Sequence, residues 1–175
     1  MLKKIALVIF AALVIIVGIA MTKPDTYTVK RTVTIKATPD KIAPLITDFH
    51  QWASWSPWEH LDPAMQRTFS GAASGKGAIY EWKGNKDVGQ GRMEITDAAS
   101  PASTRIDLLF MEPFESRNTT EFVLVPQGAE TQVTWNMAGP MNFMTKVMSV
   151  FTSMDAMIGK DFDKGLASMK AVAEK

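Results

Sequence analysis

The stretch "MNFMTKVMSVFTSMDAMIGKDFDKGLASMKAVA" (Met141–Ala173) determines what kind of fold this chain can adopt. Apolar side chains recur along it at spacings of three and four: Phe143, Val147, Phe151, Met154, Ile158, Phe162, Leu166, Met169 and Ala173. A stripe of this kind predicts one long amphipathic helix over 141–173. Gly159 and Gly165 lower its helix propensity, but they would let it bend or lie close to a sheet.

Alternating patterns upstream of this segment predict strands. Residues 27–37 alternate strictly, and Arg31 is a charged residue on the apolar face. Residues 38–49 predict a short helix, because Thr38 is a good N-cap and an apolar stripe follows it, with a kink or early end at Pro44. Further strands are predicted over 66–71, 77–84, 89–98, 104–112, 117–126 and 130–139.

Short connections with glycine, proline or asparagine join these strands, so neighbouring strands should be antiparallel. An antiparallel sheet with one apolar face needs a cover, and the helix over 141–173 is the element long enough to provide it. We therefore predict an α+β fold in which a curved antiparallel sheet wraps round a long C-terminal helix. The gap between sheet and helix is a candidate ligand cavity. Without internal repeats, residues 27–175 are expected to form one domain.

The N-terminal segment is strongly apolar. Residues 5–21 form a run of 17 residues without a charge, at the lower end of the length that spans a bilayer. We predict a membrane anchor or signal segment over residues 1–22 and a linker over 23–26. The first interpretation is an uncleaved signal anchor. A secretory signal peptide cleaved near Ala20 is the second, and a buried helix is the third.

Two lysines, Lys3 and Lys4, precede the apolar run and favour a cytoplasmic N-terminus. The domain is then predicted to face the periplasm or the cell exterior as part of a single-pass protein of the cytoplasmic membrane. Cleavage near Ala20 would instead release it as a secreted or periplasmic protein.

Composition excludes several classes of function. A net charge of +1 gives no electrostatic basis for nucleic-acid binding. The absence of cysteine excludes disulfides, thiolate catalysis and cysteine-based zinc sites. Two histidines leave little for a histidine-rich metal site, and the aspartates near the C-terminus lack the spacing of a calcium loop. We therefore predict no metal, cofactor or nucleic-acid partner, and we expect a monomer.

The order of the predicted elements is similar to the helix-grip fold of START-like proteins. The segments that carry this resemblance are "VTIKATPDKI" (33–42), "DFHQWASWSPW" (48–58), "GKGAIYEWKGN" (75–85), "GQGRMEI" (89–95), "TQVTWNM" (131–137) and "MDAMIGKDFDKGLASMK" (154–170). They resemble the membrane-anchored bacterial branch of the superfamily, often labelled SRPBCC or polyketide cyclase/dehydrase-like. The resemblance implies a hydrophobic cavity for lipids, sterols, polyketides or similar ligands. It implies no shared catalytic residues, so no residue is predicted to be catalytic.

The stretch "FHQWASWSPWEHLDP" (Phe49–Pro63) holds three of the five tryptophans and both histidines. Its aromatic residues stand three apart, so successive helical turns can direct them to one side. We interpret the stretch as a wall or lid of the cavity, with the histidines at its polar rim. The predicted cavity residues are Trp55, Trp58, Tyr80, Trp82, Met93, Phe110, Trp135, Met137, Met144, Met148 and Phe151.

Candidates for a polar anchor in the cavity are Arg31, Glu81, His50 and His60. Arg31 needs a partner or contact with water on its apolar face, so a structural ion pair is the alternative to a ligand contact. Either histidine could act as a base, but no nucleophile and carboxylate accompany them in a catalytic pattern. A surface or hydrogen-bonding role is therefore the alternative for both.

Two other patterns have structural explanations. The glycines of "GKG" and "GQG" are interpreted as hairpin turns and bulges, because strands lie on both sides of them. The methionines of the last strand and helix can form a flexible cavity wall or simply fill the core.

The predicted function is the binding or carriage of a hydrophobic or amphipathic small molecule or lipid at the outer face of the cytoplasmic membrane. Two alternatives stay open. One is an enzyme of the polyketide cyclase/dehydrase or hydrolase type that uses the same cavity. The other is an envelope protein-interaction module, which would have a filled cavity and an exposed apolar patch.

Overall fold

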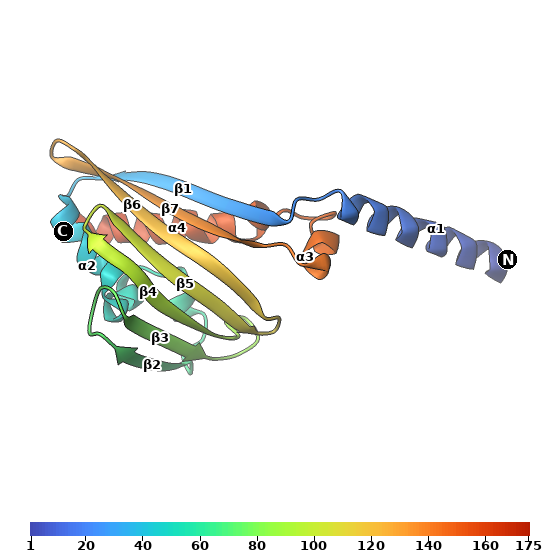
Figure 1. Cartoon of the computed structure of the whole chain (residues 1–175), viewed down its shortest axis with the longest axis horizontal. Coiled ribbons are helices and arrows are strands. Elements are labelled where there is room, and N and C mark those ends of the chain that lie inside the picture. Colours follow the sequence, from blue (N-terminus) through green and yellow to red (C-terminus); the bar gives the residue numbers. More distant parts are fainter.

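A computed structural model describes residues 1–175 (Figure 1). The α-helices are α1 (Leu2–Met21), α2 (Pro39–Thr47), α3 (Phe143–Met148) and α4 (Met154–Ala173), and two short 3-10 helices are η1 (Phe49–Ser54) and η2 (Pro57–His60). The strands are β1 (Thr26–Ile35), β2 (Gln66–Gly71), β3 (Ala78–Lys83), β4 (Gln90–Ser100), β5 (Ser103–Glu112), β6 (Ser116–Gln127) and β7 (Glu130–Pro140).

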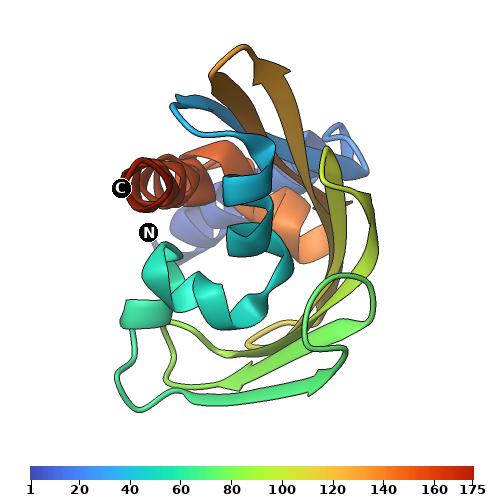
Figure 2. The same ribbon diagram turned by 90° about the vertical axis from the view of Figure 1, so that its left-hand side faces the viewer.

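The strands form one sheet in the order β1-β7-β6-β5-β4-β3-β2, and every neighbouring pair is antiparallel. β2 to β7 follow one another as a meander, and β1 completes the sheet at the free edge of β7. Figure 2 shows the sheet curving round α2 and the 3-10 helices, with α4 at the open side. The predicted α+β helix-grip fold is therefore confirmed.

The core lies between the concave face of the sheet and these helices. Ile35 of β1, Ile46 of α2, Phe122 of β6 and Phe162 of α4 are each at most 1% exposed. They belong to one continuous cluster of buried residues. Burial of this much apolar surface is the main favourable term in the folding of the domain.

The prediction of one unbroken helix over 141–173 is wrong, because residues 149–153 separate α3 from α4. Ser153 is the N-cap of α4, and its hydroxyl oxygen accepts a hydrogen bond from the Ala156 N–H at 3.1 Å. Asn142 caps α3 in the same way. Each cap satisfies a backbone donor that has no partner within its helix, which favours a new helix start over continuation.

Helix α4 lies close to the sheet at both of its glycines. A Cβ on Gly165 would stand 2.9 Å from Cζ3 of Trp135, and one on Gly159 would overlap the guanidinium of Arg31. Arg31 in turn donates two hydrogen bonds to the carboxylate of Asp155, at 2.6 and 3.0 Å. The close approach predicted from the glycines is thus present, and a bidentate ion pair between Arg31 and Asp155 holds α4 to β1.

Helix α1 projects away from the domain (Figure 1). Most of its side chains are exposed, but Ala20 in the last turn is fully buried, and α1 contacts α3. By length and composition α1 can cross a membrane, and an N-terminal signal sequence would meet the same criteria.

Candidate functional site

A cavity of about 230 Å³ lies between the concave face of the sheet, the η1–η2 segment and α4. Thirteen of its 17 lining residues are hydrophobic, so its wall is mainly apolar. The lining residues are Trp52, Ser56, Trp58, Glu59, Met65, Tyr80, Trp82, Asp87, Val88, Met93, Leu108, Phe110, Thr120, Trp135, Met137, Ile158 and Phe162.

The register of the sheet brings the strand residues of this wall side by side. Tyr80 pairs with Met93, and Met93 pairs with Leu108 across β4 and β5. On the neighbouring strands, Thr120 pairs with Met137. Since alternate residues of a strand face the same side of the sheet, these side chains all point to the concave face. The structure places these predicted residues in the cavity wall: Trp58, Tyr80, Trp82, Met93, Phe110, Trp135 and Met137.

Gly91 makes room for one of the tryptophans of the wall. A Cβ at this position would overlap the ring of Trp82, whose indole N–H donates to the Val88 carbonyl at 3.0 Å. The Trp82 ring meets Phe110 edge-on, with 5.9 Å between centroids. The register also shifts between Gln90 and Gly91, so the bulge interpretation of "GQG" holds. The space for Trp82 is a second role that the sequence pattern did not indicate.

A buried polar cluster borders the cavity at η2. Glu59 is 7% exposed. Its carboxylate accepts a hydrogen bond from the Tyr80 hydroxyl at 2.6 Å and another from Arg67 Nε at 2.7 Å. Arg67 also donates to the Glu59 backbone carbonyl at 2.7 Å. Burial, together with the adjacent carboxylate, raises the pKa of Tyr80, so the phenol keeps its proton and donates to Glu59 even above pH 10.

Trp135 carries a buried polar group without a partner. It is 2% exposed, its ring stacks on Phe162 at 4.1 Å between centroids, and its indole N–H makes no hydrogen bond within the protein. By contrast, the indole N–H groups of Trp52 and Trp55 each donate to a backbone carbonyl. Because buried donors are rarely left unpaired, the N–H of Trp135 is a candidate ligand contact in the cavity wall.

A second hollow, a groove of about 300 Å³, adjoins the cavity on the side of α3. The two spaces share Phe110, Met137 and Ile158 as lining residues. Phe114 and Met148 are among the residues that line the groove but not the cavity. Met137 thus borders both spaces, and a change in the conformation of its flexible thioether chain would alter the shape of both.

Several predicted cavity residues lie elsewhere. Met144, Met148 and Phe151 are 53%, 42% and 72% exposed and do not line the cavity. The break before α4 separates them from the stripe that faces the sheet. Trp55 is fully buried but packs behind the wall, where its N–H donates to the Leu45 carbonyl at 2.7 Å.

The predicted polar anchors do not face the cavity. The His50 side chain is 58% exposed and bonds Asp48 at 2.9 Å, while His60 is exposed at the surface. Arg31 is used by the ion pair with α4. Glu81 alternates with the inward-facing Tyr80 and therefore lies on the other face of β3. Each anchor is thus a surface or structural group, as the alternative interpretation held for Arg31 and the histidines.

The polar group that does border the cavity, Glu59, was not among the predicted site residues. Glu59 and its exposed neighbour His60 are adjacent polar residues of η2 after Trp58, and no periodic pattern in the sequence separates a buried from an exposed position there. Only the partner groups on β2 and β3 distinguish the two positions.

The sheet, the helices that it encloses and the internal apolar cavity define the class: a helix-grip protein with space for a ligand. Residues 26–174 match the family described as "Polyketide cyclase / dehydrase and lipid transport". This match covers most of the chain, and the protein belongs to that family. The resemblance to START-like and SRPBCC proteins is thereby confirmed. The family description supports ligand binding or cyclase activity. A search of curated proteins found no match.

Solved structures with the same fold come from plants and bacteria. Major latex-like protein 151 from Panax ginseng superposes with a TM-score of 0.61 at 12% identity, over 87% of this chain and 100% of that one. The Zhui aromatase/cyclase from Streptomyces sp. R1128 superposes with a TM-score of 0.61 at 14% identity, over 85% of this chain and 94% of that one. The Aha1 protein from Colwellia psychrerythraea superposes with a TM-score of 0.60 at 16% identity, over 85% of this chain and 96% of that one. At these identities the likeness extends to the fold alone.

Proposed function

We propose that this protein binds an amphipathic small molecule or lipid, with the apolar part of the ligand in the cavity. The observation that carries the proposal is an internal space lined mainly by apolar side chains with a few polar groups among them. The cavity of about 230 Å³ lies below the roughly 300–1,000 Å³ usual for ligand sites. We infer that a longer ligand keeps its polar end in the cavity and extends its apolar chain into the adjoining groove.

The charges of the wall indicate the chemistry of the polar end. Glu59 and Asp87 line the cavity, and no lysine, arginine or histidine does. A ligand carboxylate or phosphate inside would find no cationic side chain to pair with, because Arg67 is already paired with Glu59 at 2.7 Å, and an unpaired charge is costly in a space of low dielectric constant. The unpaired N–H of Trp135 instead suits a neutral oxygen acceptor. We therefore expect an alcohol, ester or ketone rather than an acid.

Displacement of a bound dye tests this proposal on the detergent-purified full chain. Nile red is the probe, and dodecanol, methyl dodecanoate and dodecanoate compete for it at pH 8. We expect the two neutral compounds to displace the dye at lower concentrations than the acid. Native mass spectrometry of the same preparation should detect a co-purified neutral lipid. Absence of dye binding together with absence of a co-purified ligand would refute the proposal.

A matched pair of variants on β5 locates the binding. Leu108 faces the cavity and is 8% exposed, whereas Leu109 next to it lies on the opposite face of the sheet. Leu108→Trp should fill the cavity and abolish dye binding, while Leu109→Trp should leave it unchanged. Equal binding by both variants would place the dye outside the cavity.

The apolar helix α1 supports a proposal for the cellular location. We propose that α1 anchors the domain at the outer face of the cytoplasmic membrane, supported by the apolar character of α1 and by Lys3 and Lys4 before it. Alkaline phosphatase, which is active only outside the cytoplasm, should be active when fused to Lys175, and the fusion should stay in the membrane fraction at full length. An active fusion that has lost α1 would indicate cleavage instead.

An enzyme that uses the same cavity is the second candidate. The observation that favours it is the presence of Glu59 and Tyr80, an ionisable pair, at the cavity wall. If the protein is a cyclase, a bound polyketide-like diketone should be recovered as a cyclic isomer of the same mass with a different chromatographic retention; if it is also a dehydrase, the product should be lighter by one water molecule. Glu59→Gln should stop either change. Recovery of the unaltered compound would refute the enzyme and support binding without catalysis.

A further inference from the structure

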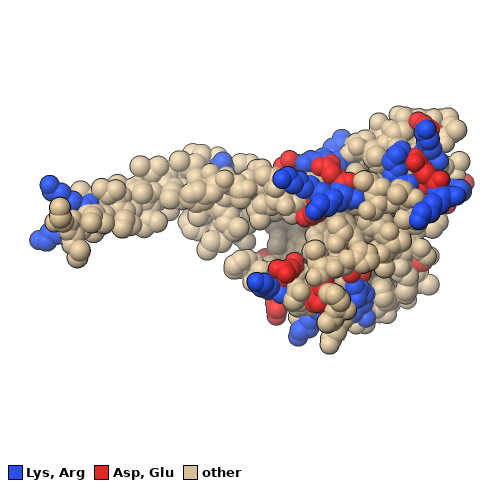
Figure 3. All heavy atoms as spheres, turned by 180° about the vertical axis from the view of Figure 1, so that it is seen from behind, with Lys and Arg blue, Asp and Glu red and all other residues tan.

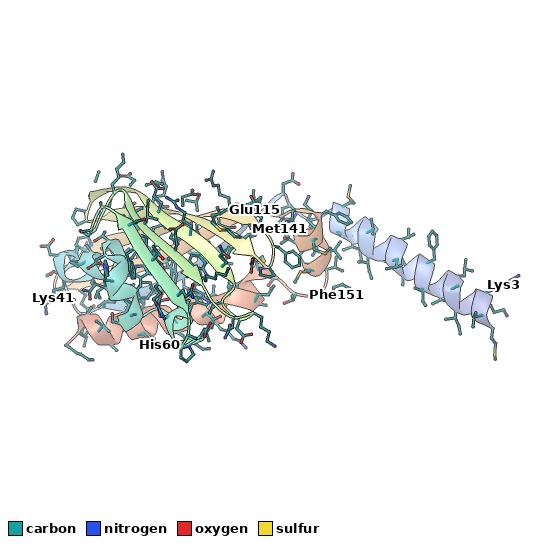
Figure 4. All side chains as sticks on the ribbon, turned by 90° about the horizontal axis from the view of Figure 1, so that it is seen from below. Lys3, Lys41, His60, Glu115, Met141 and Phe151 are labelled. Atoms are coloured by element: carbon teal, nitrogen blue, oxygen red, sulfur yellow. The ribbon has the colours of Figure 1, made fainter.

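The end of the domain next to α1 carries a group of exposed apolar side chains. Phe143, Met144 and Met148 of α3 and Phe151 just after it form this group, which we name the α3 patch. Phe151 is 72% exposed, and Phe143 and Met144 are both more than half exposed. Figure 4 shows Phe151 beside α3, at the end of the domain from which α1 leaves. Such a group on a soluble surface indicates a partner.

The chain holds α3 against the base of α1. Lys146 Nζ bonds the carboxylate of Asp25 at 2.5 Å, and the Met141 N–H donates to the Asp25 carbonyl at 2.8 Å. Ala20, in the last turn of α1, is fully buried, and α1 and α3 are in contact. If α1 crosses a bilayer, these contacts place the α3 patch at the surface of the same bilayer.

The charge of the segment suits the boundary between lipid and water. Between Met141 and Ser153 the only charged residue is Lys146, and its charge is paired with Asp25. Figure 3 shows that the surface where α1 joins the domain is mostly free of charged side chains, which gather farther along the domain. Apolar side chains beside a membrane anchor gain free energy by entering the headgroup and acyl boundary.

The groove opens beside this patch. Met148 belongs to both the patch and the groove wall, and Phe114, which is 66% exposed, lines the groove as well. Figure 3 shows a hollow between the base of α1 and the lower part of the domain. Met137 and Ile158 line both the groove and the cavity, so the two spaces adjoin at these side chains.

We infer that the α3 patch inserts into the phospholipid bilayer that α1 crosses, so that the groove opens onto lipid and a ligand passes between bilayer and cavity without entering bulk water. The position of the patch rests on α1 being retained as an anchor. The passage of a ligand rests in addition on the proposed binding function.

Fluorescence quenching on the full chain tests the insertion. The chain has no cysteine, so single cysteines at Phe151 and at Gln127 can each carry an NBD label. Gln127 ends β6, at the tip of the hairpin farthest from α1 (Figure 1). The protein is reconstituted in vesicles of phosphatidylethanolamine and phosphatidylglycerol. Lipids with a spin label near the headgroup should quench the label at 151 but not at 127, and iodide should do the reverse.

Ligand transfer tests the path. Met144→Ser combined with Phe151→Ser should slow the uptake of a fluorescent diacylglycerol from vesicles by about tenfold, from the lost insertion of two large apolar side chains. The affinity of this double variant for Nile red in detergent should equal that of the unaltered chain, because neither Met144 nor Phe151 lines the cavity. Val125→Ser is the matched control, since Val125 is 45% exposed near the hairpin tip.

The outcomes separate the two proposals. Quenching of the 151 label by iodide and not by lipid overturns the insertion, even if Nile red binds. Protection of that label only after addition of a protease-sensitive membrane extract would assign the patch to a protein partner and also overturn it. Unchanged uptake by the double variant overturns the path. Insertion without any Nile red binding would support the patch and refute the cavity function alone.

Discussion

Replacing Tyr80 with phenylalanine should destabilise the protein through Glu59. The Tyr80 hydroxyl donates to the Glu59 carboxylate at 2.6 Å, and the Glu59 side chain is 6% exposed. Hydrogen bonds to a charged group contribute about 1.5–3 kcal/mol to stability. The freed carboxylate oxygen borders the cavity, where water can replace part of the lost bond, so we expect a loss of about 2 kcal/mol. For a protein of this size that lowers Tm by about 4–8 °C.

The assay is unfolding of the full chain in dodecylmaltoside, followed by tryptophan fluorescence against urea and temperature. Tyr27→Phe is the matched control. The Tyr27 hydroxyl donates to the neutral Asn118 side chain at 2.9 Å, so its removal should cost only about 1 kcal/mol. A double-mutant cycle of Tyr80→Phe with Glu59→Gln should show that the two changes are not additive.

Two results would refute this reasoning. If the free energy of unfolding of the Tyr80→Phe variant lies within about 0.5 kcal/mol of that of the unaltered chain, the hydrogen bond to Glu59 does not stabilise the fold. If the two substitutions are additive, Tyr80 and Glu59 do not act together.

Three further predictions concern the remaining polar groups. Burial raises the pKa of both tyrosines, that of Tyr27 to about 12. The neutral phenols therefore stabilise the fold below pH 10, and this stabilisation is lost as the pH rises through the pKa values of the folded protein. Tyrosinate absorbance of the native protein at pH 10.5 would contradict the burial. Trp135→Phe should weaken the binding of neutral ligands about three- to tenfold, because the N–H is lost. The smaller ring also leaves a void in the core, so we expect a loss of stability of about 1–3 kcal/mol; unchanged affinity of the folded variant would exclude the contact. The hydrogen bond from Arg31 lowers the pKa of Asp155 below 3.8. The pair therefore stabilises the fold above that pH, and this stabilisation is lost as the pH falls through the pKa of Asp155 in the folded protein. Asp155→Asn should make the urea midpoint depend less on pH in the acid range, and an unchanged dependence would count against the ion pair.

Periodic patterns of apolar residues were sufficient to predict the class of fold. Strict alternation identified the strands, because a residue facing the core must be apolar and its neighbours face the other side. The apolar run of α1 was equally plain, since no polar residue interrupts it. Many cavity residues followed from the same alternation. Tyr80 and Met137, for example, sit at inward positions of strands whose period is regular.

Contacts between distant elements set which polar and helical residues reach the cavity. Phe151 and Ile158 share one helical stripe in the sequence, yet only Ile158 lines the cavity, because the Ser153 cap starts a new helix between them. Glu59 and His60 are adjacent, yet only Glu59 lies at the cavity, since its partners come from β2 and β3. Periodicity reports which side of one element is buried. It carries no information on which distant element supplies a partner, and for a buried charge that partner determines its place.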